Sequence, residues 1–558
     1  MQQVGEPKEG RPTAGDRGGI SPAARTASLV SKAVRGAFWM VLSGSGARIL
    51  GILGTLAVTR YLNPEAYGEV SLAALILQIA HMASNCGLSQ YIASKPNASR
   101  AVVFHATFFY TLAGLFAIGL AWVFGGSLGA ALHAPGIVRF LPGLVVATLF
   151  ERVATIQDRV QLRDLRFRSV GIQRSLGELV YSVLSVGLAA LAAGTPYGGA
   201  NALVYASIAR SLLRLITLGA TTRRRDWLEI HKIEWGTTRE LFAFGLPMAV
   251  VTLAGFGSQK FDNLVFQYHF GLAWLGYYNL AYNFADMPAM LIGEQIGDVL
   301  VPSFSHMNDD GSRKEALLLS LRVMILLVAP LAVGLAVIAP TLGKLAFPHD
   351  YQEGIIRVLQ WLALFSVART VTWIGNSYLQ VRNKPRTIMI LETGRMVGIV
   401  VFMNLFVLIG LHYQGPGHAV RWACAAVVFV FTLSALSFLV VISQLDRVPL
   451  REQILPLLPP LLAAGPMAAA VVGARRLISH FAPVALQHAP TTWDSVRTFA
   501  PRLIVEVLVG AVVFVPSALL LSPRSARELL KLVKDAGQRR RGGAENEPID
   551  HPAAVTEP

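Results

Sequence analysis

The stretch "RYLNPEAYGEVSLA" at residues 60–73 has a near-copy, "HFGLAWLGYYNLA", at residues 269–281 of this 558-residue chain. When the two are aligned with an offset of 208 residues, Gly68 matches Gly276 and the Leu–Ala pairs that follow also coincide. Each stretch lies just after one long apolar segment and at the start of the next. We interpret them as the same helix, outer turn and helix unit, present once in each half of the chain. Chance similarity of two membrane hairpins is the alternative.

The composition is that of a polytopic membrane protein. Hydrophobic residues make up 53% of the chain and charged residues only 15%, with a mean hydropathy of +0.51, which is too apolar for ordinary soluble domains. The two cysteines, Cys86 and Cys424, both lie in apolar runs, so we expect neither a disulfide framework nor a metal site. The first thirty residues lack the pattern of a cleavable signal peptide, so the first span is expected to direct targeting.

Apolar segments of membrane-spanning length recur along the chain. A hydrocarbon core about 30 Å thick requires roughly 20 apolar residues per helix. Fourteen spans are predicted on this basis, at residues 36–58, 68–88, 102–124, 137–156, 174–194, 199–220, 241–264, 273–298, 318–340, 354–378, 387–410, 418–442, 453–474 and 501–521. The predicted fold class is therefore an all-α polytopic membrane protein with about 14 transmembrane helices.

Lysine and arginine residues give the predicted orientation, because they accumulate in cytoplasmic loops. With the N-terminus inside, the cytoplasmic segments contain 31 basic residues and the outward segments five. Both termini are therefore predicted to be cytoplasmic. The formal net charge of +16 is spread over short loops rather than gathered on one domain, which argues against nucleic acid as a partner.

The repeat divides the chain into two lobes. The N-lobe (spans 1–6) is predicted at residues 31–225, the C-lobe (spans 7–12) at 226–445, and spans 13 and 14 at 446–522. An offset of six spans, an even number, implies a parallel repeat about an axis along the membrane normal, which suits a transporter with a central site. Residues 1–30 form a predicted disordered tail. Residues 523–558 form a second tail, which begins either as an amphipathic helix on anionic lipid or as a solvated helix end.

Four segments give the chain a resemblance to a known family. They are "RYLNPEAYGEVSLA" at 60–73, "DLRFRSV" at 164–170, "LGYYNLAYNFADMPAMLIGEQIGDVLVPSFSHMNDD" at 275–310 and "SYLQVRNKPR" at 377–386. Over roughly residues 30–445 the chain resembles the Wzx-type oligosaccharide flippases, in the polysaccharide-transport branch of the multidrug/oligosaccharidyl-lipid/polysaccharide exporter superfamily. The most specific element is "VLVPSFS" followed closely by an acidic pair.

The resemblance implies a fold of two six-helix bundles that form a V around a central cavity, with two peripheral helices. It also implies that the protein flips a polyprenyl-pyrophosphate-linked oligosaccharide from the cytoplasmic to the periplasmic leaflet of a bacterial inner membrane. The product would serve exopolysaccharide, capsule or O-antigen (lipopolysaccharide) assembly. The implied partners are this lipid-linked oligosaccharide, membrane lipids, and a polysaccharide polymerase with its co-polymerase.

Basic residues inside the predicted spans are the candidate substrate-binding residues, because a charge at mid-bilayer costs about 2.5–3.5 kcal/mol on insertion scales. We hypothesise that these cations line a wet central cavity and neutralise the substrate's pyrophosphate, the arginines through bidentate hydrogen bonds and the lysine as a point charge. They are Arg48, Arg210, Arg214, Lys260, Arg369 and Arg395.

The alternative for each cation is an ion pair that holds helices together. Arg395 lies three residues after Glu392, and Arg174 lies four residues before Glu178. Side chains at these spacings are neighbours on a helix surface. For these two arginines an ion pair is the preferred interpretation.

Two of the other cations lack such a neighbour. Arg48 and Arg369 have no carboxylate within one turn of their own helices, so a cavity position is preferred for them. Acidic residues also occur in spans 7 and 8, where they are candidates for proton or sodium coupling or for salt bridges with cations on other helices. They are Asp262, Glu294 and Asp298.

The sequence indicates no chemical energy source. No segment matches the phosphate-binding loop GxxxxGK[ST], and "LGKLAF" at residues 342–347 lacks both its first glycine and its hydroxyl residue. We therefore predict no ATP hydrolysis and no cofactor. A pyrophosphate gains about 2.3 kcal/mol per charge per 100 mV on leaving an interior-negative cell, so the membrane potential alone favours export.

Three other functions are weighed against the flippase. An enzyme acting on polyprenyl-linked sugars is disfavoured, because the sequence offers no paired carboxylates, Ser-His-Asp set or metal cluster with ligand spacing. A flippase for lipid II, the peptidoglycan precursor, is compatible with fourteen spans and a basic cavity. A cation-coupled multidrug antiporter is disfavoured because it requires an acidic lining, whereas a cationic cavity predicts an anionic substrate.

Overall fold

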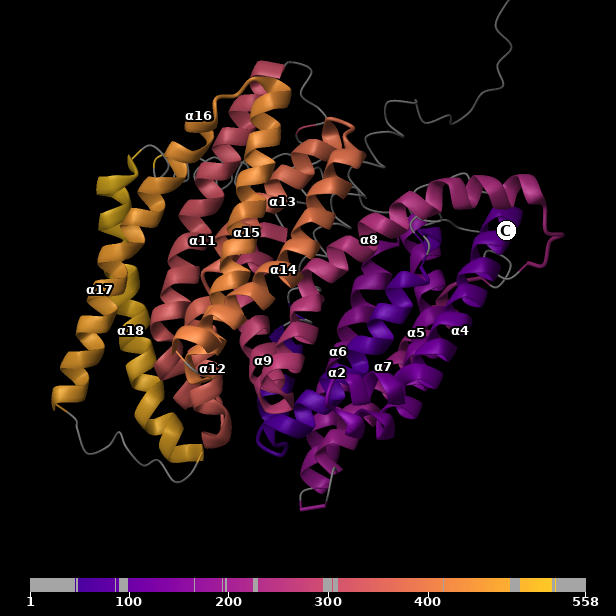
Figure 1. Ribbon diagram of the computed structural model, residues 1–558, viewed down its shortest axis with the longest axis horizontal. Coiled ribbons are helices and arrows are strands. Elements are labelled where there is room, and N and C mark those ends of the chain that lie inside the picture. The colour runs from indigo at the N-terminus through magenta and orange to yellow at the C-terminus, as the bar shows by residue number, and fades with distance from the viewer. Residues whose placement is uncertain are drawn as a thin grey trace, which may run out of the picture.

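The computed structural model describes the chain at residues 46, 49–85, 87–89, 99–164, 166–192, 194–195, 198–223, 229–294, 304, 310–414, 416–481, 492–523 and 527. Across these residues the regular structure is helical and contains no β-strand. The helices form two lobes and a peripheral pair (Figure 1). The predicted all-α fold is thus confirmed.

The N-lobe is built from the first helices of the chain. A short apolar helix, Ile49–Val58, precedes five longer ones: α2 (Pro64–Ala83), α4 (Arg100–Ala131), α5 (Leu141–Arg163), α6 (Phe167–Leu191) and α7 (Gly198–Thr221). Asn63 begins α2, because its side chain accepts a hydrogen bond from the backbone N–H of Ala66 at 2.8 Å. Pro64 takes the first helical position, where no N–H partner is lost. Local sequence therefore builds the first outer turn of the repeat.

The C-lobe is built from the helices that follow in the chain. They are α8 (Trp235–Phe270), α9 (Leu272–Pro288) with its π-helical continuation Ala289–Glu294, α11 (Asp310–Ala346), α12 (His349–Leu362), α13 (Phe365–Val381), α14 (Pro385–Gln414) and α15 (Pro416–Asp446). Gly271 separates α8 from α9 with φ +82°, a left-handed conformation that costs glycine little. The second outer turn thus depends on a glycine, whereas the first depends on Asn63 and Pro64.

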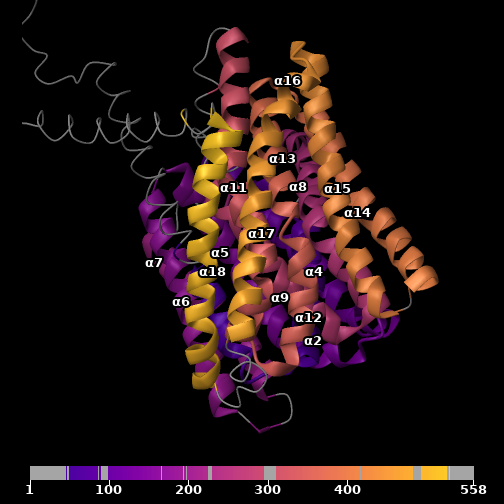
Figure 2. The ribbon, with the colours of Figure 1, turned by 90° about the vertical axis from the view of Figure 1, so that its left-hand side faces the viewer.

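The last helices form the peripheral pair. They are α17 (Leu458–Phe481) and α18 (Thr492–Leu521), which follow the short α16 (Leu450–Ile454). α17 and α18 lie side by side along α11 (Figures 1 and 2). Leu326 of α11 packs with Ala463 and Ala518 in a small apolar cluster. The two helices thus lie outside both lobes, as the resemblance implied.

Within the residues that the structure describes, each predicted span coincides with a helix. Nine of the described helices are long and apolar enough to cross a membrane, and the pair α12–α13, bent by 45°, makes a tenth. The predicted spans at 137–156 and 241–264 correspond to α5 and α8, which also carry buried polar residues such as Asp158 and Asp262. The polytopic fold is confirmed, and the count of fourteen stays a prediction.

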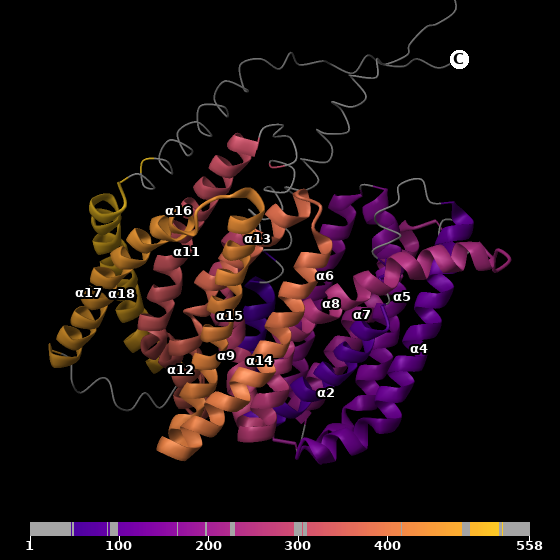
Figure 3. The same ribbon diagram turned by 45° about the horizontal axis from the view of Figure 1, so that its top comes forward.

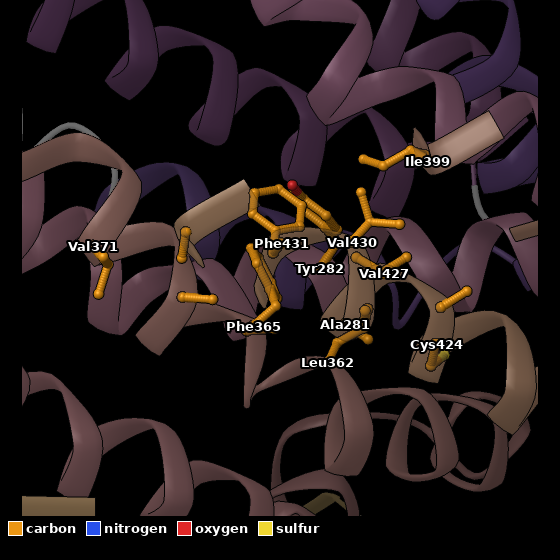
Figure 4. Packing of buried hydrophobic residues seen from close by; sticks show 14 of the residues in the cluster. Ala281, Tyr282, Leu362, Phe365, Val371, Ile399, Cys424, Val427, Val430 and Phe431 are labelled. Atoms are coloured by element: carbon orange, nitrogen blue, oxygen red, sulfur yellow. The ribbon is translucent and has the colours of Figure 1, made fainter. Parts of the chain in front are cut away.

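Each lobe has its own apolar core. In the C-lobe, Phe365 stacks on Tyr282 with ring centroids 5.1 Å apart and contacts Phe431 at 5.0 Å (Figure 4). Cys424 is buried in the same core, as predicted, while Cys86 lies outside the described residues. The N-lobe core joins α2, α4, α5 and α7 and also takes in Leu275 of α9. α9 therefore belongs to the C-lobe and also packs against the core of the N-lobe.

The two copies of the repeated stretch meet at the crossing of α2 with α9. A Cβ atom on Gly68 would lie 2.1 Å from the carbonyl oxygen of Leu272, and one on Gly276 would lie 2.5 Å from that of Pro64. Residues 64 and 68 correspond to 272 and 276 at the offset of 208, so the contact is reciprocal, as two-fold symmetry requires. The two copies of the unit are thus related by a local two-fold at this crossing, and the spacing that they share serves a backbone contact between the lobes.

The lobes approach one another at this crossing and diverge towards the opposite end, near α16 (Figures 1 and 3). α8 runs between the lobes. The N–H of Glu234, just before α8, donates to Nε2 of His105 on α4 at 2.8 Å, and Phe242 contacts Phe109. The far end of α8 packs with α9 and α14. α8 therefore ties the lobes together at the side where they diverge.

We expect Glu506→Gln to destabilise the peripheral pair by about 2 kcal/mol, because Glu506 is buried and joins three helices. Its carboxylate accepts from Arg475 of α17 at 3.0 Å and from Thr341 of α11 at 2.7 Å. Thermal unfolding of the purified protein measures the effect. Glu452→Gln, at an exposed position on α16, is the matched control, and equal midpoints for the two variants would contradict the prediction.

Candidate functional site

Charged side chains form one network in each lobe. The N-lobe network joins α5, α6 and α7 through ion pairs between helices. Arg210 contacts Glu178 at 3.1 Å, and Arg214 pairs with Glu151. The guanidinium of Arg210 also lies 4.7 Å from the ring centroid of Tyr181, a cation–π distance. The predicted cations Arg210 and Arg214 are thus brought together on α7, each opposite a carboxylate of another helix.

One predicted pair in this network is wrong. Arg174 does not pair with Glu178 in its own helix but with Asp158 of α5, at 2.7 Å. Gly177 faces α7, and a Cβ atom there would lie 3.3 Å from the Arg214 side chain. Because α6 has a glycine at this position, α7 lies close enough for Arg210 to pair with Glu178. Arg174 pairs instead with a carboxylate of the neighbouring α5.

The C-lobe network is more deeply buried. Arg369 of α13 contacts Asp286 of α9 at 2.9 Å, with the two side chains only 5% and 7% exposed. Its other hydrogen bonds go to Gln259 at 3.1 Å and to the hydroxyl of Tyr282 at 3.2 Å. Sequence spacing had left Arg369 without a carboxylate, so a cavity position was preferred. In the structure its carboxylate partner is Asp286, which lies 83 residues earlier in the chain.

The remaining C-lobe charges lie beside this pair. Arg395 pairs with Glu392 one turn earlier in α14, which confirms the predicted contact. Asp262 accepts a hydrogen bond from the hydroxyl of Tyr278 at 2.5 Å. In the described part of the chain Asp262 has no salt bridge to another helix, so that predicted alternative is not observed. Lys260 lies with its Nζ 6.0 Å from the Tyr282 ring centroid.

Three predicted site residues are not placed. Arg48 and Asp298 lie outside the described residues, and the same holds for the side chain of Glu294. Their roles stay predictions. The four arginines and one lysine that are described all belong to the two networks.

A pocket of about 220 Å³ lies between the lobes. It is lined by Ile49, Gly51, Ile52, Thr55, Glu178, Tyr181, Leu280, Asn283, Phe284, Met287 and Met290. These residues come from the first helix and α6 on one side and from α9 and its continuation on the other. Glu178 is the charged residue among those that line the pocket, and it contacts Arg210 of α7, which lies outside the lining, at 3.1 Å. The buried pair of Arg369 and Asp286 does not line it.

Sequence reasoning missed Arg152, which lies inside the predicted span 137–156. It is 2% exposed and donates to the backbone carbonyls of Tyr110 and Ser84 at 3.1 and 2.9 Å. A Cβ atom on Gly114 would lie 1.7 Å from its Nε. The arginine therefore satisfies carbonyl groups of α2 and α4. Its position within a predicted span is the sequence feature by which Arg152 could have been identified.

The chain matches known proteins of one family. Residues 57–356 match the family described as polysaccharide biosynthesis protein. The chain is 27% identical over 304 residues to the succinoglycan biosynthesis transport protein ExoT of Rhizobium meliloti strain 1021, a match that covers 54% of this chain and 60% of ExoT. It is 22% identical over 350 residues to the lipopolysaccharide biosynthesis protein WzxC of Escherichia coli K12, covering 62% of this chain and 69% of WzxC.

A solved structure shares the fold. The lipid II flippase MurJ, in its inward closed conformation, superposes with a TM-score of 0.64 at 12% identity, over 86% of this chain and 98% of MurJ. An identity this low establishes the fold alone. The two lobes and the peripheral pair are thus an arrangement that a membrane flippase also has.

Proposed function

The chain belongs to the polysaccharide biosynthesis protein family, and we propose on this premise that it flips a polyprenyl-pyrophosphate-linked oligosaccharide from the cytoplasmic to the periplasmic leaflet. The proposed product serves exopolysaccharide, capsule or O-antigen assembly. The names of ExoT and WzxC, a transport protein and a biosynthesis protein for such polymers, support a transporter rather than an enzyme. The proposed location is the bacterial inner membrane, with both termini cytoplasmic and with a polymerase and co-polymerase as partners.

One observation carries the proposal: Glu178, which lines the pocket between the lobes, is paired with Arg210 of α7. A guanidinium binds a phosphate group through two parallel hydrogen bonds. Because Arg210 and Glu178 are each 33% exposed, an entering pyrophosphate can replace the carboxylate without removing the arginine from the protein interior. Arg214, one turn further along α7, adds a second positive charge. The N-lobe network therefore binds an anion where a purely buried pair does not.

The arrangement of the lobes supports a mechanism of alternating access. The lobes close at the glycine crossing of α2 and α9 and diverge at the other end, so a substrate enters between them from the predicted cytoplasmic side. The pyrophosphate of the substrate then replaces the carboxylate of Glu178 as the partner of Arg210. Opening of the crossing then exposes the site to the periplasm, and the membrane potential favours departure of the anion.

Deletion of the gene tests the function. The expected result is loss of surface polysaccharide with accumulation of its lipid-linked repeat unit in the cytoplasmic leaflet, both restored by the intact chain. Failure of peptidoglycan synthesis with intact surface polymer would assign the protein to lipid II instead. Unchanged glycans with altered sensitivity to cationic drugs would overturn both assignments and point to an antiporter.

Arg210→Ala is expected to lower export by about 10- to 100-fold, because a charge-assisted contact to pyrophosphate contributes about 1.5–3 kcal/mol. Initial rates of repeat-unit appearance at the outer surface measure this at matched expression. Arg210→Lys keeps the charge but not the bidentate geometry, so it should recover part of the rate. Arg421→Ala, at an exposed position on α15, is the control, and export by Arg210→Ala equal to this control would contradict the assignment.

A further inference from the structure

A second pocket lies at the predicted outer side, away from the interlobe site. Its volume is about 600 Å³, within the range of ligand-binding pockets. It is enclosed by the start of α9, the end of α11 and the start of α12, which lie together beside the crossing of α2 and α9 (Figure 1). Its lining includes Trp274, Tyr277, Lys344, Gln352, Glu353 and Arg357. The proposed transport step makes no use of this pocket.

Aromatic side chains form one wall of the pocket, and they are present in only one copy of the repeat. At the offset of 208, Trp274 corresponds to Ala66 and Tyr277 to Glu69. An aromatic belt at the membrane surface would serve both lobes equally. The difference between the copies therefore indicates a task specific to this pocket.

The aromatic wall is rigid. The rings of Trp274 and Tyr277 are perpendicular, with centroids 5.4 Å apart. The hydroxyl of Tyr277 donates to the backbone carbonyl of Asp350 at 2.9 Å. A Cβ atom on Gly354 would lie 2.2 Å from the Tyr277 ring, so this glycine lets the ring lie directly against α12. A wall fixed in advance loses little entropy when a ligand binds.

The polar lining carries no excess charge. Lys344 and Arg357 are balanced by Asp350 and Glu353, and Arg357 pairs with Glu353. A pyrophosphate site would require an excess of cations. Carboxylates, an amide and cations next to half-buried aromatic rings instead suit a neutral ligand with many hydroxyl groups. The C–H faces of such a ligand pack on the rings while its hydroxyls donate and accept hydrogen bonds.

We propose that this pocket is an outward-facing subsite for neutral sugar residues of the transported oligosaccharide. The inference rests on the proposed function and adds to it a place where the glycan is held after crossing. The pocket is coupled to the lobe crossing, because Tyr351 on α12 donates its hydroxyl to the carbonyl of Leu62 at 3.0 Å and its ring contacts that of Tyr277. Separation of the lobes at their crossing therefore displaces one wall of the subsite and releases the sugar.

Binding to the purified full-length protein in lipid nanodiscs tests the proposal. The probe is the repeat-unit oligosaccharide released by mild acid from the host's own surface polysaccharide, followed by saturation-transfer NMR. The wild-type protein should bind it, and Trp274→Ala should weaken binding about tenfold, since a stacked aromatic contributes about 1 kcal/mol or more. Trp235→Ala, which removes an exposed tryptophan at the start of α8, should bind as the wild type does.

A second variant keeps the test independent of folding. The Glu353 side chain is 78% exposed, so Glu353→Ala should fold normally and still weaken binding, by about threefold. Absence of binding to the wild type, or unchanged binding by both pocket variants, would overturn the subsite while the deletion phenotype still upheld the flippase. Conversely, sugar binding that depends on Trp274, in a protein whose deletion leaves export intact, would overturn the proposed function.

Discussion

Asp286→Leu is expected to destabilise the C-lobe by about 3–5 kcal/mol, because it leaves the buried charge of Arg369 without its partner. Both side chains are at most 7% exposed, so water cannot replace the carboxylate. The hydrogen bonds of Arg369 to the neutral groups of Gln259 and Tyr282 do not balance the charge of the guanidinium. Thermal unfolding in detergent and the yield of folded protein measure the loss.

A double variant separates structure from function at this pair. Asp286→Leu combined with Arg369→Met removes both charges, and apolar replacement of a buried pair is often neutral or stabilising. We expect stability within about 1–2 kcal/mol of the wild type and retained export, because the pair does not line the interlobe pocket. A stable double variant that fails to export would instead support the sequence-based assignment of Arg369 to substrate binding.

The matched control is an exposed pair of the same type. Arg100 and Glu229 lie 3.0 Å apart with side chains 57% and 39% exposed. Glu229→Leu should cost less than about 1 kcal/mol, because an exposed arginine regains water when its partner is lost. Equal effects for Asp286→Leu and Glu229→Leu would contradict the role given to burial.

Gly276→Ala and Gly68→Ala are each expected to lower the rate of export tenfold or more. The new methyl group would lie 2.5 Å or 2.1 Å from a backbone carbonyl oxygen of the partner helix, and backbone atoms inside a helix cannot move aside as a side chain does. The helices must separate, so the contact that closes the outer side in the proposed alternating-access mechanism is lost. The reciprocal contact predicts similar effects for the two variants.

Accessibility at the crossing measures the separation directly. Leu62 is 7% exposed next to the crossing, so a Leu62→Cys variant in a background of Cys86→Ala and Cys424→Ala should react slowly with a membrane-impermeant thiol reagent. Adding Gly276→Ala should increase that rate. Gly119→Ala on α4, where a Cβ atom meets nothing within 4 Å, is the control. Normal export and unchanged labelling in Gly276→Ala would contradict a closing role for the crossing.

Much of the architecture followed from the sequence because it depends on local chemistry. The length of the apolar segments predicted the helices, since an unpaired backbone is too costly in lipid for any other spanning structure. The two glycines at an offset of 208 predicted a repeated unit. The pairing of Arg395 with Glu392 was also predicted, because helical geometry alone brings residues three apart together.

The sequence by itself thus determined an all-helical membrane protein of two related lobes, together with the set of charges that must find partners inside it. Only the tertiary structure decided which partners they found. Arg369 met Asp286 across 83 residues, and Arg174 took Asp158 rather than Glu178. The tertiary structure also places Trp274 and Glu353 in the lining of one pocket. The physical reason is that spacing within a helix is fixed by its 1.5 Å rise per residue, whereas contacts between helices depend on how whole faces pack.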